Sequence, residues 1–291
     1  MKFDKWGYLF IAPFFIAYFI FGLYPAINTF RLAFFQYDMN MPTNNFVGLQ
    51  YVIRALQDPL VYHGIFNAIK YWAVGTVFVQ FTAILVAAVF TFFKIRGTHF
   101  FKSIFYLPSV VSSAVVATIF SLFMGYPAGF VNTLIVESGF VDEPIYLLGN
   151  PVIIFCLVIF ISWWMGYGGT SITAGAGMTS ISDELYESAK IDGASFPQIF
   201  RKITIPLIWP VLTYMWMTSL IYGLQAFDIQ FMLTDSSGGP NGVAQTISMY
   251  IYKHGFEVGN VGYASGVSIV FFIVIVVLSI IMLTLLQRRE K

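Results

Sequence analysis

The sequence predicts an all-α polytopic membrane protein with six transmembrane helices. Apolar residues make up 58% of the chain and charged residues 10%, whereas soluble domains hold roughly 45–50% and 25%. A helix that crosses the hydrocarbon core needs about 20 mainly apolar residues. Six segments without Asp, Glu, Lys or Arg meet this requirement, at about Trp6–Phe30, Tyr71–Phe93, Ser103–Met124, Pro151–Met178, Leu207–Phe227 and Tyr263–Leu286.

The first apolar segment is too long for the core of a signal peptide, which spans about 7–15 residues, and no small-residue cleavage site stands out near it. We therefore expect it to be retained as the first helix. The interval from Arg31 to Lys70 that follows contains turn residues and then a mildly amphipathic stretch near Tyr51–Leu56.

Polar or turn-rich segments also separate the later spans. Residues Gly125–Asn150 precede the fourth span, Ser182–Pro206 separate the fourth from the fifth, and Thr234–Gly262 precede the sixth. None of these intervals is long enough to suggest a separate soluble domain. We expect one transmembrane domain over residues 1–291, with residues 182–206 as a loop within it.

The distribution of basic residues predicts the orientation, because cytoplasmic loops are enriched in Lys and Arg. An even number of spans places both termini on one side. With the termini inside, that side carries 11 of the 15 basic residues and the outside carries 4. The predicted protein is thus a multi-pass protein of the cell membrane with both termini and the Ser182–Pro206 loop in the cytosol.

The loop from Ser182 to Pro206 predicts two short helices joined by a sharp turn. Ser182 or Asp183 can cap the first helix, and Gly193 suits a left-handed residue at its end. Ser195 and Gln198 have the spacing of a capping box for the second helix. Helical spacing then gives one apolar stripe, which Pro206 is expected to end: Phe196, Ile199, Phe200 and Ile203.

This loop resembles the EAA loop of binding-protein-dependent ABC importer permeases. The matching residues are Glu187-Ser188-Ala189, Asp192-Gly193-Ala194 and Ile203-Thr204-Ile205-Pro206, with Ser188 in place of the family's middle Ala. The resemblance implies the type I ABC importer permease fold and a coupling helix that docks on an ATPase subunit. The residues it assigns to ATPase coupling are Glu187, Ala189, Asp192, Gly193, Ala194, Phe196, Ile199, Phe200, Ile203 and Pro206.

The resemblance extends over nearly the whole chain. Within the family, it points to the carbohydrate-uptake permeases of the maltose, glycerol-phosphate and multiple-sugar type. The residues that carry it include Tyr24-Pro25, Leu107-Pro108, Asn132, Phe227-Asp228, Gly238-Gly239-Pro240 and Gly262-Tyr263-Ala264-Ser265. Three residues separate Thr234 from Gly238, so this outer loop is longer than the family's Thr-x-Gly-Gly-Pro pattern. The resemblance implies four kinds of partner: a second homologous permease, two ATPase subunits, an extracytoplasmic substrate-binding protein and a sugar substrate.

The sequence does not resemble that of an enzyme. It contains no Gly-x-x-x-x-Gly-Lys-[Ser/Thr] phosphate loop, so ATP and Mg²⁺ are expected at partner ATPase subunits and no cofactor on this chain. The three histidines lack metal-ligand spacing, the single Cys156 excludes an internal disulfide, and a net charge of +1 gives no reason to expect nucleic acid as a partner. Spans without ionisable residues favour a neutral substrate and an external energy source over ion coupling.

The fourth and fifth spans, which flank the cytosolic loop, are the expected substrate pathway. Sugars present hydroxyl groups and apolar ring faces, which polar and aromatic side chains can contact. The candidate residues are Ser162, Gly166, Tyr167 and Gly169 on the fourth span and Ser219, Tyr222, Gly223 and Gln225 on the fifth. Small residues are also common where membrane helices pack, so packing remains the alternative for each of them.

Two functions follow from these observations. The first is a permease subunit of an ATP-driven sugar importer, which forms half of the pathway and couples to a separate ATPase through the 182–206 loop. The alternative is a self-sufficient secondary carrier or channel for a neutral solute.

Overall fold

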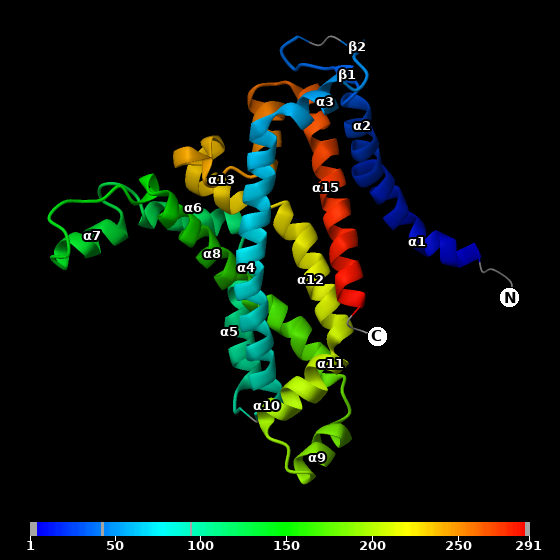
Figure 1. The fold of residues 1–291 in the computed structure, drawn as a ribbon, viewed down its shortest axis with the longest axis vertical. Coiled ribbons are helices and arrows are strands. Elements are labelled where there is room, and N and C mark those ends of the chain that lie inside the picture. The colour runs from blue at the N-terminus through cyan, green and yellow to red at the C-terminus, as the bar shows by residue number, and fades with distance from the viewer. Residues whose placement is uncertain (1–4, 42–43, 94, 289–291) are drawn as a thin grey trace. The chain divides into compact units, whose positions relative to one another are not determined.

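The computed structural model describes residues 5–41, 44–93 and 95–288, and it is helical apart from one short hairpin. Four helical segments in this part of the chain are long and apolar enough to cross a membrane: Gly7–Leu32, Pro59–Phe92, Pro151–Thr179 and Val261–Gln287. Two bent helix pairs raise the number to six if each pair is one span (Figure 1). The predicted all-α membrane fold is confirmed, although two of the six expected spans meet the length requirement only as part of a bent helix pair.

One compact unit comprises Met1–Tyr62 and Tyr250–Val274. Its N-terminal helix is made of α1 (Lys5–Tyr18), a π-helical turn (Phe19–Leu23) and α2 (Tyr24–Leu32). The strands β1 (Phe35–Gln36) and β2 (Asn45–Phe46) pair in antiparallel register, with Phe35 opposite Phe46, and lead to α3 (Gln50–Gln57). The last long helix, α15 (Val261–Gln287), begins in this unit.

Asp58 is the polar centre of this first unit. Its Oδ2 accepts hydrogen bonds from the hydroxyls of Tyr250, at 2.6 Å, and Tyr263, at 2.5 Å, and its Oδ1 accepts from the Leu60 N–H at 2.9 Å. Burial alone would raise the pKa of the Asp58 carboxyl, but these hydrogen bonds outweigh it and the pKa is lowered. The ionised carboxylate therefore joins the end of α3 to α14 (Ile247–Tyr252) and to the first turn of α15.

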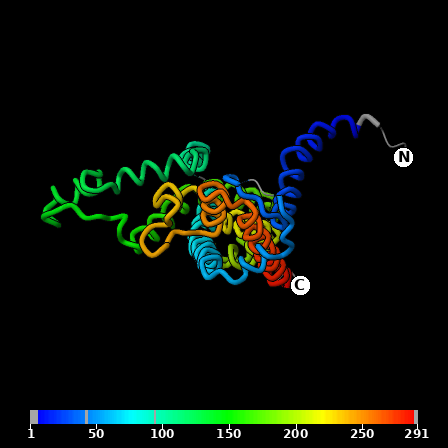
Figure 2. Tube along the Cα trace, turned by 90° about the horizontal axis from the view of Figure 1, so that it is seen from above, coloured from blue at the N-terminus to red at the C-terminus, as the bar shows by residue number. Residues whose placement is uncertain are grey.

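The second unit comprises His63–Met249 and Ile275–Lys291. Its helices are α4 (Pro59–Phe92), α5 (Thr98–Val110), α6 (Ser113–Phe123), α7 (Phe130–Glu137), α8 (Pro151–Thr179), α9 (Asp183–Ile191), α10 (Phe196–Ile199), α11 (Ile205–Leu207), α12 (Trp209–Leu224) and α13 (Asp228–Thr234). Seen from above, the hairpin of α6 and α7 extends sideways from the long helices of this unit (Figure 2).

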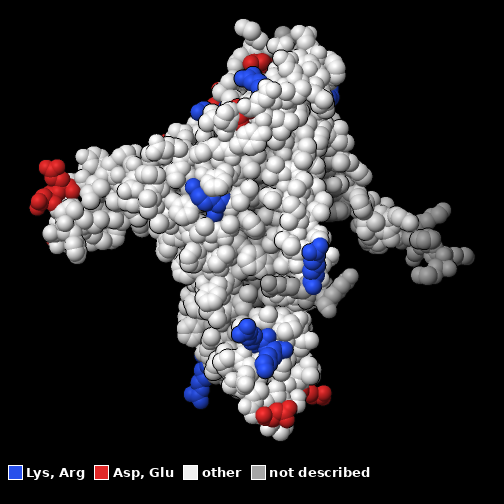
Figure 3. Space-filling model, viewed as in Figure 1, with Lys and Arg blue, Asp and Glu red and all other residues white. Residues whose placement is uncertain are grey.

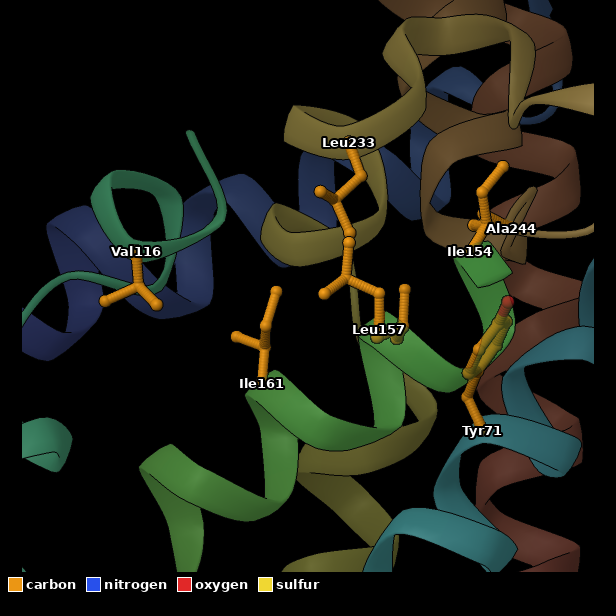
Figure 4. Packing of buried hydrophobic residues seen from close by; sticks show 8 residues of the cluster. Tyr71, Val116, Ile154, Leu157, Ile161, Leu233 and Ala244 are labelled. Carbon is orange, nitrogen blue, oxygen red and sulfur yellow. The ribbon is translucent and has the colours of Figure 1, made fainter. Parts of the chain in front are cut away.

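Two apolar clusters form the core of the second unit. One side of α8 carries Ile154, Leu157 and Ile161 toward Val116 of α6 and Leu233 of α13 (Figure 4). Nearer the other end of α8, a second cluster joins residues of α4 and α8 to Ile208 and to residues of α12. Its members are Ala87, Ala88, Ala174, Met178, Ile208, Leu212 and Met215. Because α8 contributes to both clusters, it is the central helix around which α4 and α12 pack.

The third predicted span, Ser103–Met124, is a bent pair of helices rather than one continuous helix. A second bend separates the loop helix from the fifth predicted span, Leu207–Phe227, at its start. The first break follows Pro108, where Val111 and Ser112 are extended, and α5 and α6 differ by 84°. At the second break Ile208 leaves helical geometry, and the helices on either side differ by 69°. Proline residues near both breaks remove backbone donors, which allows the helices to end there.

The other spans agree with prediction, apart from the start of the second. Asn150 caps α8 by accepting from the Val152 N–H at 2.9 Å, so this helix begins at Pro151 as expected. The second helix begins at Pro59 rather than near Tyr71. Asp58 caps its first turn, and proline is favoured at the first helical position, where its missing N–H costs nothing.

Candidate functional site: a coupling loop and a membrane cavity

The loop after α8 folds as the two short helices that the sequence predicts. Ser182 Oγ accepts from the Glu184 N–H at 3.3 Å and caps α9. Gly193 ends the helix with a φ of +75°. The Gly193 N–H donates to the Lys190 carbonyl at 3.0 Å and the Ala194 N–H to the Ala189 carbonyl at 2.9 Å. This pair of bonds is a Schellman motif, which needs a left-handed residue at Gly193 and brings Ala189 and Ala194 together.

The second helix of the loop is longer than expected. Gln198 Oε1 accepts from the Ser195 N–H at 2.7 Å, in the capping geometry that the sequence predicts. Pro206 does not end this helix, because a π-helical turn over Phe200–Thr204 comes just before it. Wider π-type bonding relieves the conflict between the proline ring and the preceding turn. The helix therefore continues to Leu207 and ends at Ile208.

The inner side of the loop packs on the end of α4. Tyr186, Ala189 and Ile199 form a buried cluster that Phe92 of α4 covers. The Phe92 ring lies edge-on to Tyr186 at 5.0 Å and to Phe196 at 5.2 Å. The apolar stripe predicted for the second helix is thus largely covered by the chain itself, with Ile199 buried and Phe200 and Ile203 partly buried. This packing fixes the position of α9 relative to the membrane helix α4.

The opposite side of α9 is not covered by any described part of the chain. Its exposed residues are Glu184, Glu187, Ser188 and Ile191. Ile191 is 86% exposed, the most for any large apolar side chain of the described residues. Acidic side chains gather at this tip of the molecule, with basic ones from the second helix nearby (Figure 3). The sequence interpretation did not single out Ile191, although its position on the helix opposite Tyr186 was readable from the period of 3.6.

A cavity of about 600 Å³ lies between α4, α8 and α12. Six of the eight predicted pathway residues line it: Ser162, Gly166, Gly169, Ser219, Tyr222 and Gly223. Ser109 of α5 and Gln230 of α13 complete the wall. The two helices that the sequence predicts for the pathway therefore do face one common space.

Tyr167 and Gln225 do not line the cavity. The Tyr167 ring stacks on Trp163 at 5.4 Å and lies 5.8 Å from the Phe105 ring. Gln225 is exposed, and its Nε2 donates to the Ile221 carbonyl one turn earlier, at 2.7 Å. Both residues belong to the predicted helices but lie on other faces of them.

Two glycines of this site, Gly166 and Gly223, both line the cavity and contact a neighbouring helix closely. A Cβ at Gly223 would lie 2.6 Å from the indole Cδ1 of Trp72, and one at Gly166 would lie 3.2 Å from Val79. Both glycines therefore let α4 approach closely while they also line the cavity. Close packing at these two positions therefore does not exclude a place in the cavity wall.

The sequence interpretation missed the α4 side of the cavity. Trp72, Thr76 and Gln80 recur every four residues along α4 and all line the space. The Trp72 indole N–H donates to Ser219 Oγ at 3.4 Å, across to α12. Gln80 is only 3% exposed, and within the described part of the chain its Oε1 has no hydrogen-bond partner. The sequence signal for this wall was the four-residue spacing of Trp72, Thr76 and Gln80 within an otherwise apolar span, which places them on one helix face.

Hydrogen bonds join the loop after α13 to α4 beside the cavity. Asn67 Nδ2 donates to the carbonyls of Gly242 and Gln245, at 2.9 and 3.0 Å. The Tyr71 hydroxyl donates to the Val243 carbonyl at 3.1 Å, and Tyr71 also lines the cavity. The loop that carries the Gly238-Gly239-Pro240 motif is therefore attached to a residue of the cavity wall.

Comparison with known proteins agrees with this fold and these sites. Residues 80–291 match the family described as binding-protein-dependent transport system inner membrane component. The arabinooligosaccharides transport system permease protein AraP of Bacillus subtilis is 32% identical over 96% of this chain and 87% of its own length. The lactose transport system permease protein LacF of Rhizobium radiobacter is 29% identical, covering 99% of this chain and 96% of LacF.

A solved structure shares the whole fold. It is a chain of a bacterial ABC transporter involved in the import of the acidic polysaccharide alginate, with a TM-score of 0.85 and 25% sequence identity. The match covers 100% of this chain and 98% of that chain. A second structure of a bacterial alginate ABC transporter, in complex with an alginate pentasaccharide-bound periplasmic protein, gives the same TM-score at 26% identity.

The fold and the two sites define a membrane subunit of an ABC importer. The chain belongs to the family of binding-protein-dependent transport system inner membrane components. It is a multi-pass permease of the inner membrane and part of a complex with a binding protein and an ATPase. ATP hydrolysis lies in the partner subunits. The names of AraP and LacF assign these relatives to transport systems for arabinooligosaccharides and lactose.

Proposed function

We propose that this permease imports a neutral sugar through the cavity between α4, α8 and α12. The observation that carries the proposal is the chemistry of the cavity wall. Among the described residues that line it, none is Asp, Glu, Lys, Arg or His. The wall instead offers hydroxyl and amide groups together with the aromatic rings of Trp72, Tyr214 and Tyr222. Such a wall can bond sugar hydroxyls and stack on sugar ring faces.

The buried Gln80 Oε1 lines the cavity and lacks a hydrogen-bond donor within the described chain. A buried polar atom without a partner costs roughly 1–3 kcal/mol. A hydroxyl group that enters the cavity can supply the missing donor, so part of this cost would be recovered when substrate is present. The carbohydrate relatives support a sugar as the source of that hydroxyl.

We expect Gln80→Leu to reduce sugar uptake by about 5–150-fold, because the loss of one such hydrogen bond is worth roughly 1–3 kcal/mol. Uptake is measured in cells or proteoliposomes that contain the complete transporter. Thr213→Val is the matched control, since the Thr213 hydroxyl is also buried without a partner in the described chain but does not line the cavity. Equal uptake by the two variants would remove Gln80 from the pathway.

The proposed transporter contains this chain, a second homologous permease, two ATPase subunits and an extracytoplasmic sugar-binding protein. Each permease supplies half of the pathway. The exposed face of α9, with Glu187 beside Ile191, docks on one ATPase. Because the other face of the loop is packed on Phe92, movement of the docked ATPase is passed to α4, which is a wall of the cavity.

The proposed orientation puts both termini and the 182–206 loop in the cytosol, as the 11-to-4 distribution of basic residues predicts. Ser188 and Ser237 are both exposed, so each can be replaced by cysteine in a Cys156→Ser background. A membrane-impermeant thiol reagent added outside intact cells should label Ser237→Cys and not Ser188→Cys. Labelling of Ser188→Cys alone would reverse the orientation and separate the loop from any cytosolic ATPase.

A further inference from the structure

The short helix α3 has one side that packs on the rest of its unit. Ala55 is fully buried, and Tyr51 is half-buried against the start of α15. A Cβ at Gly262 would lie 2.7 Å from the Tyr51 ring, and one at Gly266 would lie 2.9 Å from Tyr51 Cβ. These glycines therefore let α3 lie directly on α15 (Figure 1). At 1.5 Å per residue, Gly266 is about 8 Å from the first residue of α15.

The next side of α3 is apolar and uncovered. Leu49 is 56% exposed, Ile53 50% and Leu56 49%. The spacing of four and three residues places these aliphatic side chains in one row along the helix. No described part of this unit covers the row.

The third side of α3 is polar. Gln50, Arg54 and Gln57 are exposed and lie on the far side of the helix from Ala55 and Val52. The Arg54 guanidinium lies 4.5 Å from the centroid of the Tyr263 ring, so this charge is held against the protein. The helix thus shows three sectors in turn: one toward α15, one apolar and one polar.

We propose that α3 is an interfacial helix whose row of Leu49, Ile53 and Leu56 lies in the lipid leaflet that surrounds the start of α15. A helix with an apolar edge and a polar edge lies in the membrane plane, with its apolar side roughly 5–10 Å into the boundary of headgroups and acyl chains. Contact with the first turns of the membrane helix α15 places α3 at this depth. The row is purely aliphatic, and α15 itself carries exposed apolar side chains beyond the contact with α3, including Phe272 and Ile273.

The test uses single cysteines in the complete transporter, with Cys156 replaced by serine. Spin labels are attached at Leu56→Cys, on the apolar side, and at Gln50→Cys, on the polar side, in nanodiscs of phosphatidylethanolamine and phosphatidylglycerol. We expect the ratio of collisions with oxygen to collisions with a water-soluble nickel chelate to be several-fold higher at position 56 than at position 50. Ile53→Cys should behave as Leu56→Cys does and replaces it if that variant fails to assemble.

Equal ratios at positions 56 and 50 would overturn the proposal. A label at position 56 that becomes shielded only when the substrate-binding protein is added would overturn it as well, and would assign the row to that protein. Neither result depends on the substrate or on the sidedness of the termini, so this proposal can fail while the proposed function stands.

Discussion

Replacing Gly193 with valine is expected to uncouple ATP hydrolysis from transport while the chain remains inserted in the membrane. Gly193 has a φ of +75°, which costs a residue with a Cβ roughly 1–2 kcal/mol, and more for a β-branched one. Apart from its neighbours in the chain, no atom of the described residues lies within 4 Å of the position that a Cβ would take, so a steric clash does not contribute. The strain would be relieved by a change in the angle between α9 and the second helix.

The measurement is co-purification of the ATPase together with sugar-stimulated hydrolysis in reconstituted membranes. Gly193→Asn is the matched control, because asparagine adopts the left-handed conformation more readily than other residues. We expect the valine variant to lose attachment or stimulation and the asparagine variant to keep most of both. Wild-type values for the valine variant would show that the loop angle does not matter for coupling.

Ser219→Trp is expected to reduce sugar uptake to background. Ser219 lines the cavity of about 600 Å³, and its hydroxyl accepts from the Trp72 indole across the space between α12 and α4. An indole at this position would fill the space that the sugar needs and displace Trp72. The partner subunits should still co-purify, because the coupling loop is unchanged.

Gln225→Trp provides the control directly after the same helix. Gln225 is exposed and outside the cavity wall, so a bulky side chain there should leave uptake close to that of the wild type. Equal loss of uptake by the two variants would indicate a packing effect rather than a blocked pathway. Normal uptake by Ser219→Trp would remove the cavity from the transport route.

The predictable parts of the structure are those determined by local chemistry. The turn at Gly193 and the cap at Ser195 and Gln198 follow from backbone hydrogen bonds within a few residues, and both form as expected. The span at Pro151–Thr179 is predicted closely because an apolar run begins directly after a capping asparagine.

The features that the sequence interpretation missed depend on contacts between distant segments. The bend after Pro108 places α6 against α13, and nothing near Ser112 specifies that partner. The continuation of the second loop helix past Pro206 depends on a π-helical turn that the helical pattern does not reveal. The spacing of Trp72, Thr76 and Gln80 places them on one face of α4, but only the packing of α8 and α12 against that face shows that it lines a cavity.

The most direct test of the central claim is uptake by proteoliposomes of defined composition. The vesicles contain this chain with its partner permease and ATPase, with ATP on the side of the α9 loop and the sugar-binding protein on the other. Uptake of labelled sugar is expected only when ATP, the ATPase and the binding protein are all present, and it should stop when Mg²⁺ is chelated. Uptake by this chain alone, without ATP or partners, would contradict the claim and identify a self-sufficient carrier or channel.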